Sequence, residues 1–164
     1  MATRRQRGQD DVAEPRWLAP DELDAWRALA KLMARLPAAL DRQLQRDARL
    51  SYVEYYVLAG LSERPGRSMR LYHLAEMVNV ELSRLSHMIN RLERRGLVRR
   101  EPDPTDRRST LAVLTDEGHA HLAAVAPGHV QRVRELLIDA LGREELLALG
   151  EASKHVTARL EALD

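Results

Sequence analysis

Residues 74–118 read LAEMVNVELSRLSHMINRLERRGLVRREPDPTDRRSTLAVLTDEG, and this stretch decides the fold of the chain. Large apolar residues recur in it at the spacing of an amphipathic helix, namely Leu82, Leu85, Met88, Ile89 and Leu92. At about 100° per residue they gather on one side, which we expect to face the core. The opposite side carries hydrogen-bonding groups and positive charge, from Ser83, Arg84, His87, Asn90, Arg91 and Arg94. Such a face suits the major groove of DNA.

The end of this helix is predicted at Gly96, because glycine tolerates the positive φ that commonly follows a last helical turn. Residues 97–101 and 109–114 are then two short runs rich in Val, Leu and Thr, separated by a segment with two prolines. They predict an antiparallel hairpin with a long tip. The tip carries Arg107 and Arg108 outward, and projecting arginines suit a narrow minor groove, where the negative potential is enhanced.

Positive charge is concentrated in this part of the chain. Residues 84–108 include eight arginines and four acidic residues, a surplus of four, whereas the whole chain has a net charge of only +1. Clustered charge of one sign creates a local potential that attracts a polyanion. The sequence therefore predicts a binding surface for double-stranded DNA, with Arg94 and Arg99 as further phosphate contacts.

Three runs in this segment resemble the winged helix-turn-helix of the MarR family of transcriptional regulators: LAEMV at 74–78, SRLSHMINRLERRGLVRREPDPTDRRS at 83–109 and LTDEG at 114–118. The resemblance implies a mainly α fold, with a three-helix core, a β-hairpin wing, and N- and C-terminal dimerisation helices. It also implies that Ser83, Arg84, Ser86 and His87 lie early on the recognition helix, whereas Asn90 and Arg91 are candidate DNA contacts because they share its exposed face. On the wing it implies that Arg108 enters the minor groove beside Arg107 and that Asp106 pairs with Arg108.

Two positions depart from the family pattern. Asn79 stands where the family commonly has glycine before the recognition helix, and Glu81 stands where serine commonly begins that helix. Asparagine tolerates the left-handed conformation, so we expect the turn to be kept. Glutamate is a poorer N-cap than serine, which leaves the first residue of the helix open.

The flanks of this segment predict helices that a small winged domain cannot cover. Leucines and other apolar residues recur at helical spacing through residues 20–47, where Pro37 is expected to kink or divide the helix. Ser51 and Glu54 form a capping box for the next helix, and Thr115 is a good N-cap for a long one with a kink expected at Pro127. We expect a disordered arm at 1–15, dimerisation helices at 16–50 and 116–164, and the winged domain at 51–115.

Composition narrows the other possibilities. The chain has no cysteine, so disulfides, Cys-based zinc sites and a thiol switch are excluded. His119 and His121 point about 200° apart on a helix, so no metal site is predicted there, and no cofactor is expected. The usual nucleophile, phosphate-binding and HExxH motifs are missing from the sequence, which argues against an enzyme. With no signal-peptide or membrane-spanning pattern, we expect a cytoplasmic protein without a membrane partner.

The resulting hypothesis is a homodimeric regulator, expected to be a repressor, that binds a pseudo-palindromic operator and is released by a small aromatic effector. Trp26, Tyr55 and Tyr56 are candidates for the effector pocket, although core packing is an alternative role for each of them. Two other hypotheses remain open. One is a constitutive or architectural DNA-binding protein without an effector site, and the other is a module whose wing binds an acidic protein.

Overall fold

The structure is a computed structural model that describes residues 15–106 and 108–163. Arg107 and nearly all of the disordered arm expected at 1–15 therefore lie outside the described residues. The chain divides into two compact units, residues 1–34 and residues 35–164. Helix α1, Pro20–Ala48, begins in the first unit and ends in the second.

The described part of the first unit is the start of α1 and the few residues before it. The Ala19 N–H donates to the Glu22 carboxylate at 2.8 Å, which caps the first turn. Most of the large apolar side chains in this unit are exposed, namely Trp17, Leu18, Trp26, Leu29, Leu32 and Met33. This unit therefore presents much of its apolar surface to solvent.

Proline does not divide either of the helices in which the sequence places one. α1 continues as one helix through Pro37, so division, one of the two outcomes expected there, does not occur. Pro127 likewise lies inside α5, Asp116–Val133. Strong helix formers such as Ala34 and Ala38 flank Pro37, and they help the helix to persist across the backbone hydrogen bond that proline cannot make.

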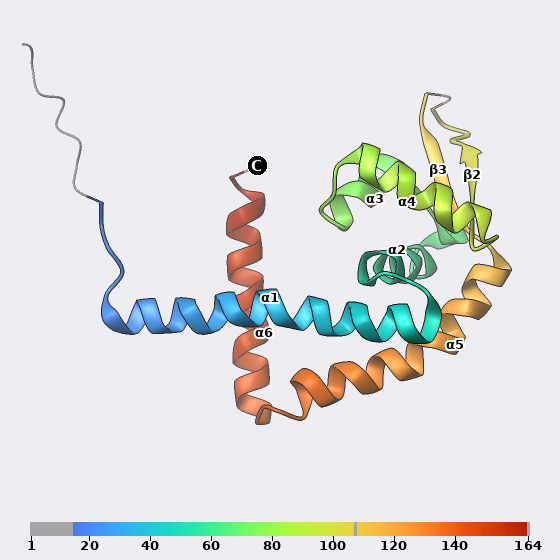
Figure 1. Ribbon diagram of the computed structural model, residues 1–164. Coiled ribbons are helices and arrows are strands. Elements are labelled where there is room, and N and C mark those ends of the chain that lie inside the picture. The colour runs from blue at the N-terminus through green and yellow to red at the C-terminus, as the bar shows by residue number, and fades with distance from the viewer. Residues whose placement is uncertain (1–14, 107, 164) are drawn as a thin grey trace, which may run out of the picture. The chain divides into compact units, whose positions relative to one another are not determined.

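The second unit holds the winged helix-turn-helix. After α1 its elements are α2 (Tyr52–Ser62), η1 (Pro65–Arg67), β1 (Ser68–Arg70), α3 (Leu71–Met77), α4 (Leu82–Arg94), β2 (Val98–Pro102), β3 (Thr110–Leu114), α5, η2 (Arg134–Ile138) and α6 (Arg143–Glu161). Helices α3 and α4 lie beside the β2–β3 hairpin, and α2 packs against β3 and α5 (Figure 1). The prediction of a mainly helical winged helix-turn-helix is confirmed.

The core of this unit lies where the end of α1 and the helices α2, α3 and α4 meet the sheet. Its largest fully buried side chains are Leu44, Leu50, Val57, Leu58, Leu61, Leu74, Leu85, Ile89, Leu92 and Val98. Burial of each such side chain contributes about 1.5–3 kcal/mol of transfer free energy, so this cluster dominates the stability of the domain. The capping box expected at the start of α2 is present, since Ser51 and Glu54 exchange two hydrogen bonds of 2.8 and 3.1 Å.

The sheet has three antiparallel strands in the order β1–β3–β2. The predicted hairpin pairs Val98 with Leu114 and Pro102 with Thr110. Strand β1, which the sequence analysis did not predict, adds to the other edge of β3, pairing Ser68 with Val113. Because β1 leads directly into α3, the main-chain hydrogen bonds between β1 and β3 fix the start of α3 beside the wing.

The start of α5 is held closely against the start of the wing. Thr115 caps α5 by accepting from the Gly118 N–H at 2.9 Å, and its hydroxyl donates to the Gly96 carbonyl at 2.6 Å. A Cβ at Gly118 would overlap with the Leu97 carbonyl oxygen, so this junction requires glycine. Gly96 has φ +73°, as expected for the residue that follows α4.

Helix α6 follows Gly142, whose N–H donates to the Glu145 carboxylate at 2.8 Å. Every residue of α6 is exposed or half-buried, although the helix carries several large apolar side chains. Over the part of the chain that the structure describes, none of the helices is both long enough and apolar enough to cross a membrane.

Candidate nucleic-acid interface

Helix α4 has the two faces that its sequence predicted. Leu85, Met88, Ile89 and Leu92 are buried, and the opposite face is solvent-exposed at Ser83, Arg84, His87, Asn90, Arg91 and Arg94. The prediction that Leu82 also faces the core is wrong, since this residue is 47% exposed. Leu82 is the first residue of the helix, where half-buried Val78 and Val80 from the preceding turn occupy the core side.

The turn before α4 keeps its shape without glycine. Asn79 has φ +50°, the left-handed conformation expected for it, and its N–H donates to the Glu76 carbonyl at 3.0 Å. Glu81 is the N-cap residue of α4, and within the described chain its side chain makes no capping hydrogen bond. The first N–H groups of α4 therefore remain available to an anionic ligand at this helix end.

Arg91 has a partner inside the protein. Its Nε and Nη2 donate to Oε1 of Glu54 at 3.1 and 2.9 Å. Glu54 is buried, and its other oxygen accepts the Ser51 N–H of the capping box. One buried carboxylate thus closes the start of α2 and holds the exposed face of α4.

Arg100 donates hydrogen bonds to two more of the predicted DNA-contact residues, Asn90 and Ser86. Its Nη1 donates to Asn90 Oδ1 at 2.5 Å and to Glu93 Oε2 at 2.6 Å, and its Nη2 donates to the Ser86 carbonyl at 3.0 Å. These bonds join strand β2 to the middle of α4. Asn90 and Ser86 are therefore engaged in positioning the helix against the wing.

The remaining arginines near the end of α4 differ in their surroundings. Arg94 is exposed, and its Nε donates to the Asn90 carbonyl of its own helix at 3.3 Å. Arg95 donates to the Arg49 and Ala48 carbonyls at 2.7 and 3.2 Å, which closes the end of α1. Arg99 on the wing is paired with Glu101 at 2.7 Å, but it remains exposed. Of these three, Arg94 and Arg99 remain open to phosphate.

At the wing tip, Arg108 is almost completely exposed, with its side chain at 97% of the accessible maximum. Asp106 lies 3.8 Å from the Arg108 Nε and accepts the Arg108 backbone N–H at 3.1 Å and the Ser109 hydroxyl at 2.8 Å. The hydrogen bond from Ser109, and after it that from the Arg108 N–H, holds the pKa of the Asp106 carboxyl below its usual range. Asp106 thus fixes the backbone from which Arg108 projects. Arg107 lies outside the described residues.

The tip loop of the wing, between β2 and β3, is held by an arginine that the sequence did not single out. Arg70 Nε donates to Oδ2 of buried Asp103 at 2.5 Å, and Arg70 Nη2 donates to the Thr105 hydroxyl at 3.0 Å. The Thr105 hydroxyl and N–H also bind Asp103, and together with Arg70 they hold the pKa of the Asp103 carboxyl far below its usual range. Residues 70 and 103 are distant in sequence, so periodicity carried no signal for this pair.

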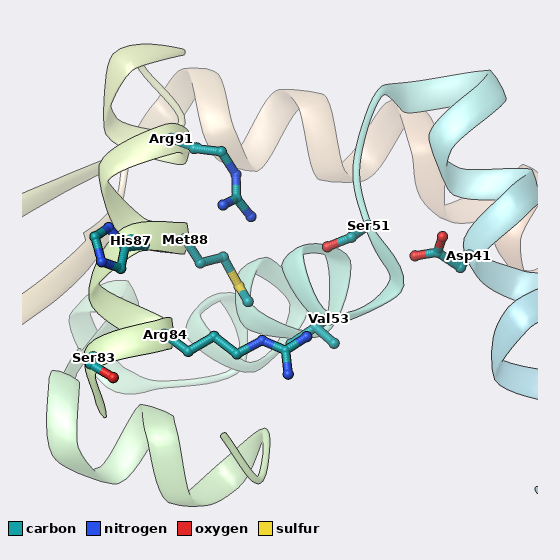
Figure 2. Close-up of a pocket in the computed structure, with 8 residues that line it drawn as sticks. All are labelled: Asp41, Ser51, Val53, Ser83, Arg84, His87, Met88 and Arg91. Atoms are coloured by element: carbon teal, nitrogen blue, oxygen red, sulfur yellow. The ribbon is translucent and has the colours of Figure 1, made fainter. Parts of the chain in front are cut away.

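A cleft of about 520 Å³ lies between α4 and the start of α2. Its lining residues are Asp41, Ser51, Val53, Ser83, Arg84, His87, Met88 and Arg91. Figure 2 shows Arg84 and Arg91 extending from α4 into this cleft, with Ser51 and Val53 across from them. We call it the recognition-helix cleft. Its lining includes four predicted DNA contacts, Ser83, Arg84, His87 and Arg91, so a ligand here would compete with DNA for the same side chains.

The three effector candidates lie in different environments. Trp26 is exposed in the first unit. Tyr55 is buried, with its ring 4.2 Å from that of His129, and burial raises the pKa of its hydroxyl. Tyr56 is exposed and lines, with Tyr52, a small hollow of about 170 Å³. Of the three, Tyr55 is part of the core, and Tyr56 is accessible to a ligand.

His129 is the buried histidine of this cluster. Its Nδ1 lies 3.4 Å from Oε1 of Gln43, which is also buried, and its ring packs on Tyr55. Burial lowers the pKa of the His129 imidazole, so the neutral form is favoured in the fold. Gln43, Tyr55 and His129 thus connect α1, α2 and α5, with the contact between Gln43 and His129 as a polar one among apolar side chains.

An exposed helix with donors and cations, a helix and turn before it, and a wing with a projecting arginine define a winged helix-turn-helix DNA-binding protein. The family model described as MarR family matches residues 50–110. The regulator PecS of Dickeya dadantii (strain 3937) is 30% identical over 131 residues, which cover 76% of this chain and 79% of PecS. The chain belongs to the MarR family of transcriptional regulators, whose members are DNA-binding proteins and not enzymes.

Other comparisons agree. The structure of Sco3205, a MarR family transcriptional regulator from Streptomyces coelicolor in complex with DNA, has a TM-score of 0.84 and 45% identity, covering 88% of this chain and 90% of that one. The transcriptional regulator HosA of Escherichia coli O111:H- is 38% identical over 78 residues, which are 48% of this chain and 56% of HosA. The alignment thus spans little more than half of HosA.

Proposed function

We propose that this protein is a homodimeric repressor in the cytoplasm that binds a pseudo-palindromic operator and leaves it when a small effector binds. The observation that carries the proposal is the exposed face of α4 together with the Arg108 tip of a wing that Arg70 and Asp103 hold in place. In this reading Ser83, Arg84 and His87 contact base edges, since they are exposed early on the helix that enters the groove.

The other predicted contacts take different roles in the proposal. Arg94 and Arg99 contact phosphates, and Arg108 enters the minor groove beside Arg107. Ser86, Asn90 and Arg91 support the helix from within the protein, because each is bonded to Arg100 or Glu54. Sequence preference should therefore depend on the first half of α4.

Dimerisation is supported by the apolar surface that the chain leaves uncovered. Leu147, Val156, Leu160 and Leu163 are exposed at its C-terminal end, and Trp26 and Met33 are exposed in the first unit. Monomers seldom expose so many large apolar residues, and a second copy is the simplest cover for them. We therefore retain 16–50 and 116–164 as dimerisation regions and 51–115 as the winged domain.

An effector would enter the recognition-helix cleft, whose lining combines Arg84 and His87 with apolar Val53 and Met88. A small aromatic acid has the chemistry for this lining, because its carboxylate can bind a guanidinium while its ring contacts the apolar side chains. It would compete directly with DNA for Arg84. The constitutive alternative predicts that no small molecule changes operator affinity.

The test of operator binding is selection from a pool of random duplexes, followed by footprinting on the enriched sequence. We expect two inverted half-sites whose centres lie about 10 base pairs apart, as for other symmetric helix-turn-helix dimers. Recovery of random sequences would contradict specific binding and favour the acidic-protein hypothesis. A single half-site would contradict the dimer.

The dimer itself is tested by placing charge on α6. Leu147→Asp with Leu160→Asp should dissociate the protein in sedimentation experiments and reduce operator affinity, although the whole DNA-facing surface is unchanged. Ala148→Asp is the control for added charge, since it places a carboxylate at an exposed position of α6 that lies about 100° around the helix from Leu147 and about 120° from Leu160. A doubly substituted protein that stays dimeric and protects both half-sites would place the interface elsewhere.

A further inference from the structure

An apolar patch interrupts the polar surface of the interface at the start of α4. It consists of Leu82, 47% exposed, and Tyr72 of α3, 59% exposed. Both residues line two clefts. One, of about 460 Å³, is bounded by Ser86 and by Arg108 of the wing, and the other, of about 500 Å³, is bounded by Asn79 and Arg84.

The patch lies between the two arginines that the proposed function assigns to DNA. Arg84 follows Leu82 by two residues on α4, and Arg108 borders the cleft that Leu82 lines from the other side. A duplex that contacts both arginines must therefore cover Leu82. Covering an exposed leucine with another apolar group is favourable, whereas covering it with a polar base edge desolvates that edge without a hydrogen bond.

The major groove offers one apolar group on its base edges, the C5 methyl of thymine. Residues at the N-terminus of a recognition helix are those that approach base edges, and Leu82 is the first residue of α4. A deoxyribose of the backbone is also partly apolar, but contact with it would carry no base preference. The position of Leu82 on the helix favours the base.

We propose that Leu82 reads a thymine in each half-site by direct contact with its C5 methyl group, and that Tyr72 borders this contact from α3. The inference rests on the proposed function, because it requires α4 to enter the major groove. It assigns an apolar element of sequence specificity to a surface that otherwise recognises DNA through charge and hydrogen bonds.

The experiment removes the thymine methyl group from the DNA and, separately, the Leu82 side chain from the protein. Each thymine of the selected operator is replaced by deoxyuridine, which differs from it by the methyl alone, and affinities are measured for the wild type and for Leu82→Ala. The wild type should bind about fourfold more weakly when the critical methyl is lost, the effect of uncovering one such group. Leu82→Ala should bind the thymine and uracil versions of that site equally.

Three further results make the conclusion specific to the contact. Leu82→Met, which keeps an apolar side chain of similar size, should retain the preference for thymine. Thermal unfolding should show that Leu82→Ala is folded, since the substituted side chain is half-exposed. At the other thymines of the operator, the ratio of the two affinities should be the same in all three proteins.

The proposal is overturned if that ratio is equal in the wild type and Leu82→Ala at every thymine, or if the selected half-site has no thymine. It is equally overturned if Leu82→Ala weakens specific and random DNA by the same factor, which would place Leu82 on the backbone. Failure of the proposed function is distinguishable from these outcomes, because no sequence would be enriched in the selection.

Discussion

Replacement of Arg91 by alanine should weaken the fold rather than remove a phosphate contact. The substitution removes two hydrogen bonds, of 3.1 and 2.9 Å, from a Glu54 carboxylate that is only 7% exposed. Hydrogen bonds to a charged group contribute about 1.5–3 kcal/mol. The Arg91 side chain is 52% exposed, so solvent screening reduces this value, and we expect a loss of about 1–2 kcal/mol in the free energy of unfolding.

Urea unfolding of the full-length chain measures this loss, with Arg94→Ala as the matched control. Arg94 lies on the same exposed face, and its side chain bonds to a carbonyl of its own helix, so its removal should change stability by less than about 0.5 kcal/mol. Glu54→Gln removes the charge but keeps an oxygen that can accept the Ser51 N–H. In a double-mutant cycle Glu54→Gln and Arg91→Ala should together cost less than the sum of their separate effects.

The salt dependence of DNA binding then shows whether Arg91 stabilises the fold or contacts a phosphate. A phosphate contact contributes about 0.9 to the slope of log K against log salt, so losing one per subunit would lower the slope of a dimer by about 1.8. We expect Arg91→Ala to leave the slope unchanged. A lower slope with unchanged stability would refute the reasoning and return Arg91 to the DNA contacts predicted from the sequence.

Other substitutions test the remaining parts of the interface and the fold. Arg84→Ala should cost about 1–3 kcal/mol on the selected operator and less on random DNA, as measured by titration; equal losses would make Arg84 a phosphate contact. Arg108→Ala should weaken binding more when the operator has A·T-rich flanks than when its flanks are G·C-rich, and indifference to the flanks would leave the wing outside the minor groove. The depressed pKa of Asp103 contributes stability that is present above its unfolded pKa of about 3.9 and is lost as the pH falls below it. Asp103→Asn should therefore be less stable at neutral pH and lose less on acidification, and an unchanged acid profile in urea unfolding would contradict this role. The lowered pKa of His129 means that protonation opposes folding, so stability should fall as the pH drops below the unfolded value of about 6.5. His129→Phe should flatten this fall between pH 6.5 and 5, and a retained slope would assign it to another group.

The elements of the winged domain could be predicted because their signals are local. The burial of Leu85 and Ile89, the positive φ of Gly96 and Asn79, and the pairing of the hairpin each follow from the residues that form them. Leu82 was assigned to the wrong face because periodicity extends the core-facing side of a helix to its terminal residues, and Leu82 is the first residue of α4. At the end of a helix the neighbouring turn decides which side is covered.

The hydrogen-bond partners of the arginines could not be predicted from such local signals. Counting arginines treated Arg91, Arg95 and Arg100 as available to DNA, whereas each binds an acceptor inside the protein. Their partners are distant in sequence in two cases, with Glu54 lying 37 residues before Arg91 and Arg49 lying 46 before Arg95. The surplus of charge therefore located an exposed cationic face, but it did not show which arginines are bonded within the protein.

The contact of Gly118 with Leu97 has a mechanical consequence. The first turn of α5 has no room to slide on the start of the wing, and the Thr115 hydroxyl ties the same turn to the Gly96 carbonyl. We therefore expect a tilt of α5 at this junction to rotate the hairpin with it. In the proposed complex with DNA, a small displacement of α5 would then change the angle at which Arg108 meets the duplex.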